Sequence, residues 1–262
     1  MSFKHSVCRW CFEDTPLLEL ADWCQEIGIA GIDLLHPGEV EHIKNRGLIC
    51  PVTAVPEHQS GLGCIEKAFN NPDHHKTLLE IYRELIPQAA EAGIPNVITF
   101  SGNREGLSDE QGLENCARGL EPLLKLAEEH DVTLIMELLN SKVDHPDYQC
   151  DHSDWGVALC EKLGSPRFKL LYDIYHMQVM EGDVMATIKR HSSYFGHYHT
   201  AGCPGRNELD TTQELYYPAI IEAIKSTGYT GYLAHEFVPT WPDHKAALID
   251  AVKRCSQVGI PV

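Results

Sequence analysis

The stretch EIGIAGIDLL (residues 26–35) decides the fold, because its pattern returns along the chain. In it a helical segment ends in a glycine, and a short apolar run follows. The same pattern occurs in NRGLICPV (45–52), EAGIPNVITF (91–100) and STGYTGYLAHEF (226–237). A glycine just past a helix is typical of a left-handed C-cap, and a continuous apolar run of this length indicates a buried parallel strand. The repeated unit is therefore a helix followed by a parallel strand.

Over the whole chain the pattern predicts eight strands, near residues 4–10, 29–35, 48–54, 95–101, 132–139, 168–174, 194–200 and 231–237. Four helix start signals lie between or after them: Thr15-Pro16, the capping-box spacing Ser108 to Gln111, Ser153, and Pro242-Asp243 before a helix expected to end near Gln257. A doubly wound sheet uses similar units, but no glycine-rich phosphate fingerprint follows the first strand. The prediction is an α/β fold, a (β/α)8 TIM barrel forming one domain over residues 1–262.

Charge limits the classes of partner. The 262 residues include 21 Lys and Arg against 38 Asp and Glu, a formal net charge of −17. Such a surface repels phosphate backbones and anionic lipid, so we expect a small-molecule substrate and no nucleic-acid or membrane partner. Charged residues interrupt the first fifteen positions, which argues against a signal peptide and for a cytoplasmic protein. A homo-oligomer is compatible with the sequence.

The ten cysteines are spread over the chain, so we expect most to be reduced and buried. Cys8 and Cys11 have CxxC spacing on the first predicted strand. Because no second such pair accompanies them, a structural, redox-inert role is the favoured interpretation.

Polar residues occur late in four consecutive strands that are otherwise apolar. Glu137 ends the fifth strand, Asp173 the sixth and Glu236 the eighth, and His199 comes late in the seventh. In a barrel the strand C-termini share one rim, so these side chains should converge. Three carboxylates would repel one another there without a cation. Three oxygens and an imidazole nitrogen suit one divalent Mn, Mg, Co or Zn ion.

Other histidines receive different predictions. His197 lies one layer deeper than His199, which favours a supporting hydrogen bond over metal ligation. His235 has the opposite parity to Glu236 and should face the helices. His58 and His145 lie on predicted loops at the barrel mouth, His58 within the long insertion 55–73.

Four stretches give the sequence a family resemblance: MELLN (136–140), YDIYHMQ (172–178), HYHTAGCPGR (197–206) and HEF (235–237). With them the chain resembles the xylose-isomerase-like TIM barrels, which include sugar isomerases, ketose 3-epimerases and endonuclease IV. It is most similar to the hydroxypyruvate isomerase branch. The sequence departs from that branch at Leu138, where proline is expected, at Cys203, which replaces asparagine, and at His199, where some members have glutamine.

The resemblance implies roles for particular residues. Glu137, Asp173, His199 and Glu236 match the metal ligands, and Glu137 and Glu236 also match the acid/base pair. His176 and Arg206 match substrate-binding positions. Asn140, the last residue of the MELLN stretch, and Trp10, expected in the apolar wall at the end of the first strand, are further candidates for substrate binding.

The implied activity is a metal-dependent isomerisation of a small hydroxy-carbonyl compound through an enediolate, most simply hydroxypyruvate to tartronate semialdehyde. A ketose 3-epimerase or another sugar isomerase would use the same ligands. An endonuclease-IV-like nuclease needs more metal ions and a basic face, which the charge of −17 disfavours. A non-enzymatic binding barrel is a further alternative.

Overall fold

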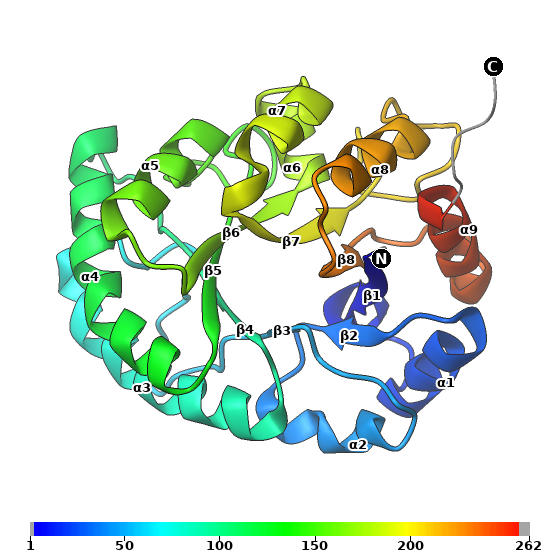
Figure 1. Ribbon diagram of the computed structural model, residues 1–262, viewed down its shortest axis with the longest axis horizontal. Coiled ribbons are helices and arrows are strands. Elements are labelled where there is room, and N and C mark those ends of the chain that lie inside the picture. Colours follow the sequence, from blue (N-terminus) through cyan, green and yellow to red (C-terminus); the bar gives the residue numbers. More distant parts are fainter. Residues whose placement is uncertain (1–2, 257–262) are drawn as a thin grey trace.

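The computed structural model describes residues 3–256, and its central feature is a ring of parallel strands surrounded by helices (Figure 1). The strands are β1 (Lys4–Cys8), β2 (Gly31–Asp33), β3 (Val52–Thr53), β4 (Asn96–Thr99), β5 (Thr133–Glu137), β6 (Phe168–Asp173), β7 (Phe195–Thr200) and β8 (Tyr232–His235). Their order in the sheet is β2-β1-β8-β7-β6-β5-β4-β3, and all paired strands are parallel. The predicted (β/α)8 barrel is confirmed as a single TIM-barrel domain.

Backbone contacts close the ring between β2 and β3. The Ile32 amide donates to the Ile49 carbonyl at 2.9 Å, and the Leu34 amide donates to the Val52 carbonyl at 2.7 Å. Gly31 lies at this seam, where a Cβ atom would come within 2.9 Å of the Ile49 carbonyl oxygen. A residue without a side chain therefore allows the two strands to approach.

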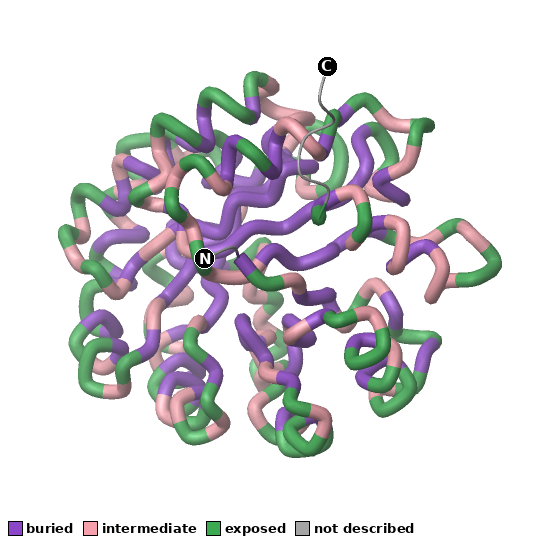
Figure 2. The backbone as a smooth tube through the Cα atoms, turned by 45° about the vertical axis from the view of Figure 1, so that its right-hand side comes forward, coloured by how far each residue is buried: buried purple, intermediate pink, exposed green. Residues whose placement is uncertain are grey.

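The helices lie outside the ring. They are α1 (Leu17–Ile27), α2 (Glu41–Lys44), α3 (Pro72–Ala92), α4 (Asp109–Glu129), α5 (Ser153–Leu163), α6 (Ile174–Met180), α7 (Val184–His191), α8 (Tyr217–Ser226) and α9 (His244–Ser256), with 3-10 turns η1 (Arg9–Phe12), η2 (Pro37–Glu39) and η3 (Ser192–Tyr194). Buried residues follow the strands and the inner helix faces, whereas the outer helix faces are exposed (Figure 2). No helix within residues 3–256 is long and apolar enough to cross a membrane.

The helix signals were mostly correct. Gly28 ends α1 in the left-handed conformation with φ 86°, as the repeated pattern predicts. The Ser108–Gln111 capping box opens α4, and α5 begins at Ser153. Thr15-Pro16 was placed one residue early, because Pro16 is the N-cap of α1 instead of its first helical residue. Gln257, the predicted end of α9, lies outside the described residues.

The first predicted strand was too long. β1 stops at Cys8, and the chain turns into η1, so Cys11 is not on the strand. Burial raises the pKa of both the Cys8 and Cys11 thiols well above 9.0. All ten cysteines lie in the described part of the chain, and all are free.

Candidate metal centre and active site

Three carboxylates meet at the C-terminal rim of the barrel. Glu137 is the last residue of β5, Asp173 is the last residue of β6, and Glu236 follows β8 directly. All three side chains are almost completely buried, with at most 5% of any residue exposed. They lie in one cluster in which the candidate ligand atoms are within 4.8 Å of one another. The structure thus brings the predicted carboxylates together.

His199 reaches the same cluster from β7. Its Nδ1 atom lies 3.0 Å from Glu236 Oε2, 3.4 Å from Glu137 Oε1 and 4.0 Å from Asp173 Oδ2. The backbone explains this, because Asp173 and His199 are direct neighbours across β6 and β7. The four residues predicted as metal ligands therefore surround one point.

A second imidazole, that of His176, enters the cluster from α6. Its Nδ1 accepts hydrogen bonds from the backbone N–H of Asn140 at 3.2 Å and from the side-chain Nδ2 of Asn140 at 2.6 Å. The Asn140 amide is held in this orientation because its Oδ1 accepts from the backbone of Val143 and its Nδ2 also donates to Asp144. Burial, and then the charge of Arg206, lowers the pKa of His176 well below 6.5.

The tautomer of His176 follows from these contacts. A neutral imidazole whose Nδ1 accepts must carry its proton on Nε2. His176 therefore presents an N–H donor to the carboxylate cluster and has no lone pair there for a cation. Of the two histidines at the cluster, His199 suits a metal ligand and His176 suits a hydrogen-bond donor to a substrate oxygen.

The two glutamates differ in their surroundings. Glu236 accepts hydrogen bonds from Trp10 Nε1 at 2.8 Å and from Arg206 Nη2 at 2.7 Å. Burial opposes ionisation of Glu236, but His199 and Arg206 outweigh it and hold its pKa well below 4.5. Glu137 Oε1, by contrast, has no hydrogen-bond partner among residues 3–256. Glu236 is therefore held by two hydrogen-bond donors, whereas Oε1 of Glu137 is held by none among the described residues.

The pKa of Asp173 is raised because the side chain is buried beside other carboxylates. Burial, and then the charge of Glu236, raises its pKa from 3.8 to about 8. Its Oδ1 caps α6 by accepting from the His176 amide at 3.0 Å, which leaves Oδ2 toward the cluster. Repulsion of this kind is relieved when a cation binds between the carboxylates.

Four buried polar atoms at the cluster have no hydrogen-bond partner in the described chain: Glu137 Oε1, Asp173 Oδ2, His176 Nε2 and His199 Nδ1. Native proteins satisfy nearly all buried polar atoms, so such a concentration needs an explanation. Three carboxylates and one imidazole lone pair fit a divalent cation, and the remaining N–H fits a ligand of that cation.

A cavity of about 530 Å³ opens above the cluster. The charged and polar side chains that line it are Glu57, Glu66, Glu137, Glu236, Arg206 and His145, and the segment after β3 contributes residues 54–57 and 62–66. The predicted placement of this insertion at the mouth is therefore confirmed. Trp10 lines the cavity from η1, which agrees with its predicted place in the wall.

Arg206 is fixed beside the cluster from the loop after β7. Its guanidinium carbon lies 5.0 Å from the centre of the Trp10 ring and 5.7 Å from that of Tyr175. Nη2 is used by Glu236, but the buried Nε atom makes no hydrogen bond to any described residue. A donor thus remains for an anionic ligand.

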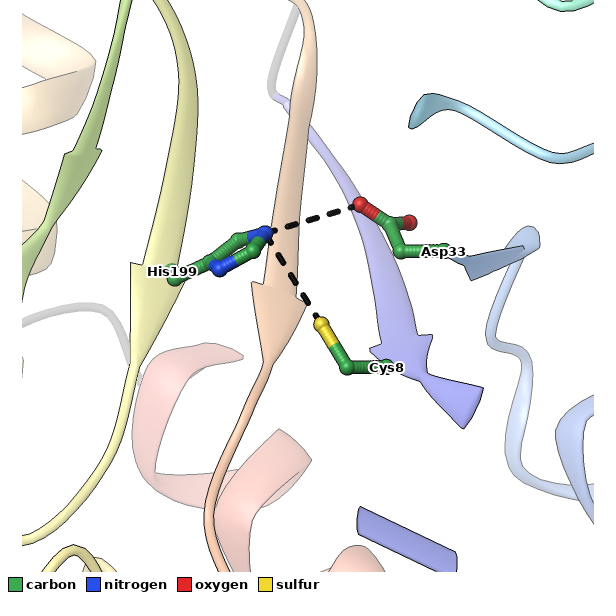
Figure 3. Close-up of side chains that lie close together, drawn as sticks. All are labelled: Cys8, Asp33 and His199. Carbon is green, nitrogen blue, oxygen red and sulfur yellow. Dashed lines mark hydrogen bonds and ion pairs between the residues drawn. The ribbon is translucent and has the colours of Figure 1, made fainter. Parts of the chain in front are cut away.

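Sequence reasoning missed a deeper layer of polar residues. Asp33 ends β2, is fully buried, and lies 2.6 Å from His197 Nε2 and 3.8 Å from His199 Nε2. Cys8 Sγ is 3.7 Å from the same His199 nitrogen (Figure 3). Burial opposes ionisation of Asp33, but His197 and His199 lower its pKa. The signal was present, since Asp33 is an acidic residue late in an apolar strand.

The secondary predictions for two histidines fit the structure. His197 contacts Asp33 in the layer below the carboxylates, in keeping with a supporting role. His235 lies away from the carboxylate cluster, 3.2 Å from His5 Nδ1, and His5 in turn contacts Ser256 on α9.

Comparison with known proteins gives a consistent picture. The family model described as xylose isomerase-like TIM barrel matches residues 21–257. A 2-oxo-tetronate isomerase from Cupriavidus necator is 38% identical over 108 residues, which is 41% of this chain and 41% of that protein. A hydroxypyruvate isomerase from Escherichia coli K12 is 29% identical over 134 residues, or 51% of each chain. These matches therefore span only about half or less of the length of those relatives.

Among solved structures, an AP endonuclease of family 2 from Brucella melitensis superimposes with a TM-score of 0.83. The superposition covers 94% of this chain and 96% of that one at 22% sequence identity. At that identity the likeness concerns the fold alone.

Proposed function

Because the chain belongs to the xylose isomerase-like TIM-barrel family, we propose that it is a metal-dependent isomerase of a small α-hydroxy carbonyl acid. The reaction we assign is hydroxypyruvate to tartronate semialdehyde through an enediolate. The observation that carries this assignment is the difference between Glu137, whose Oε1 has no hydrogen-bond partner among residues 3–256, and Glu236, which two donors hold. Isomerisation needs one mobile base, whereas epimerisation needs two.

Glu137, Asp173, His199 and Glu236 would hold one divalent Mn, Mg, Co or Zn ion. When bound, such an ion polarises the substrate carbonyl and acidifies the neighbouring C–H bond. This role accounts for the unpartnered buried atoms and for the raised pKa of Asp173.

The protein side chains perform the proton transfers. Glu137 removes the proton from the hydroxymethyl carbon and returns it to the former carbonyl carbon. The hydroxyl proton moves to the former carbonyl oxygen, and the N–H of His176 stabilises the negative charge on oxygen while this occurs. Glu236 stays ionised because Trp10 and Arg206 donate to it.

Arg206 would bind the substrate carboxylate. It is the cation that lines the cavity beside the cluster, and its Nε donor faces no partner in the part of the chain that the structure describes. The fork of a guanidinium suits a planar carboxylate. Both named relatives, a hydroxypyruvate isomerase and a 2-oxo-tetronate isomerase, support an acidic substrate.

The test is turnover of hydroxypyruvate, 2-oxo-tetronate, fructose and tagatose after loading the metal-free protein separately with each metal. Deuterium exchange from solvent into the substrate is measured in parallel. Glu137→Gln should abolish exchange even when measured metal content is restored, and Glu236→Gln should retain part of it. Absence of turnover with every metal would refute the enzyme assignment. It would favour the alternative of a non-enzymatic binding barrel.

A ketose 3-epimerase is the second candidate, and cavity size favours it. About 530 Å³ is large for a three-carbon acid, and the wall includes apolar side chains such as Ile98 and Phe100. Turnover of fructose or tagatose with little turnover of the acids would establish this alternative.

A further inference from the structure

A buried layer beneath the carboxylate cluster takes no part in the proposed reaction. It consists of Cys8 at the end of β1, Asp33 at the end of β2 and His197 on β7. Cys8 and Asp33 are direct neighbours across the two strands, and none of the three residues is more than 1% exposed. Figure 3 shows Cys8 and Asp33 converging on one nitrogen of His199.

The two ring nitrogens of His199 have different surroundings. Nδ1 faces the carboxylate cluster, with Glu236 at 3.0 Å as its nearest oxygen. Nε2 points the other way, toward Cys8 Sγ at 3.7 Å and Asp33 Oδ2 at 3.8 Å. An imidazole that gives the Nδ1 lone pair to a cation carries its proton on Nε2. That N–H is buried, and it needs an acceptor.

Asp33 is the better acceptor of the two neighbours. A thiol is a weak acceptor, whereas a carboxylate accepts strongly, and neither oxygen of Asp33 has a hydrogen-bond partner among residues 3–256. The 2.6 Å separation from His197 also fixes Asp33 in place. A fixed carboxylate can define where the ring of His199 lies.

We propose that Asp33 is a positioning residue: it accepts the Nε2–H of His199 and so presents Nδ1 to the cation, while His197 holds Asp33. The inference rests on the proposed metal site. The present 3.8 Å separation exceeds hydrogen-bond length, so Nε2 must shift by about 1 Å when the bond forms. Metal-bound histidines commonly pair with a carboxylate in this way.

A competing explanation is that Cys8, Asp33 and His199 themselves bind a second cation, since their ligand atoms lie within 4.8 Å of one another. His197 Nε2 lies 2.6 Å from Asp33 Oδ2, so a protonated His197 would balance the charge of Asp33 without a cation. Such a pairing favours positioning over a second cation site.

The primary experiment measures Mn²⁺ affinity of the metal-free protein by calorimetry against a competing chelator. Asp33→Asn keeps the shape but loses the charge, and it should weaken binding by about 10- to 100-fold. His197→Asn should weaken binding in the same direction. Cys8→Ala is the matched control from the same layer and should change affinity less than about threefold. Equal affinity of Asp33→Asn and wild type, or an equal loss in Cys8→Ala, would overturn the proposal.

Histidine nitrogen NMR of the zinc-loaded wild type gives an answer that does not depend on any variant folding. The expected spectrum has His199 bound through Nδ1 with a proton on Nε2, and metal analysis should find one zinc per chain. Binding through Nε2, or two zinc ions per chain, would contradict the positioning role.

The two proposals fail in different ways. A wild type that binds metal and turns over substrate, with an unaffected Asp33→Asn variant, refutes only the positioning of His199. A wild type that binds no divalent metal refutes the metal-dependent function and the positioning together. Because affinity is measured without substrate, the identity of the substrate does not enter either result.

Discussion

The role assigned to Arg206 can be tested by Arg206→Lys. Lysine keeps a positive charge near Glu236, which the arginine contacts at 2.7 Å, and so preserves the pairing of that buried carboxylate. It loses the planar fork and with it the Nε donor that has no partner among the described residues. Arginine and lysine are equally disfavoured by the left-handed backbone at this position, where φ is 58°. The comparison therefore measures the effect of losing the guanidinium group.

The loss should be about one charge-assisted hydrogen bond to the substrate carboxylate, or about 1.5–3 kcal/mol. At about 1.4 kcal/mol per tenfold, kcat/KM for hydroxypyruvate should fall by about 10- to 100-fold. Any activity toward a neutral ketose should change far less, and so should metal affinity. Initial rates at saturating metal measure the effect, with Arg46→Lys, at an exposed ion pair with Asp22, as control. An unchanged kcat/KM for the acid, or an equal fall for acid and ketose, would refute carboxylate binding by Arg206.

Three further results are expected. Removing metal with a chelator should lower the melting temperature, and metal at about 100 times Kd should restore about 2.7 kcal/mol of stability, as calorimetric scans can measure. Because folding raises the pKa of Asp173 from 3.8 to about 8, the metal-free fold loses stability from this group as pH rises between those values. Metal-free Asp173→Asn should therefore gain stability over wild type with rising pH, by denaturant titration; a constant difference would contradict the shift. Gly31→Ala should cost about 1–3 kcal/mol because the new Cβ meets the Ile49 carbonyl, whereas Gly38→Ala, with open space around it, should change stability by less than about 0.5 kcal/mol.

The barrel was predictable because its pattern is local. Each helix–glycine–strand unit shows its C-cap and its buried strand within about ten residues, as at Gly28 and Gly93. Strand ends were less predictable, because they depend on pairing between distant segments. The third strand reads as residues 48–54 in sequence, yet only Val52–Thr53 forms regular pairs, with β4. The seam with β2 uses isolated bridges that no local pattern reveals.

The positions of the carboxylates were also predictable, because they follow from where each predicted strand ends. Parallel strands in a barrel end at one rim, so an acidic residue late in an apolar strand must point to a shared site. Glu137, Asp173 and Glu236 satisfy this rule, and so does Asp33, which lies outside the four consecutive strands from which the site was predicted. Applied to all eight strands, the rule would have found Asp33, although not its depth below the rim.

The family resemblance assigned the two cluster histidines different roles, but the physical basis of that difference could not be obtained from sequence. His176 and His199 both lie late in or just after strands, and both reach the carboxylates within a few ångströms. Their roles depend on what touches the far nitrogen of each ring. Asn140, from the loop after β5, donates to Nδ1 of His176 and makes that ring an N–H donor at the cluster.

Asp33 lies behind His199 and can only accept, so it favours a proton on the far nitrogen and, when a cation binds, a lone pair at the cluster. The chemical state of each imidazole is therefore decided by a residue on another element of the barrel. This is why the two variants that test it most directly, Asp33→Asn and Asn140→Ala, change neither histidine. The first should weaken metal binding, whereas the second should leave metal affinity nearly unchanged and lower kcat, because it frees the tautomer of His176. A loss of metal affinity in Asn140→Ala equal to that in Asp33→Asn would mean that His176, too, is a ligand.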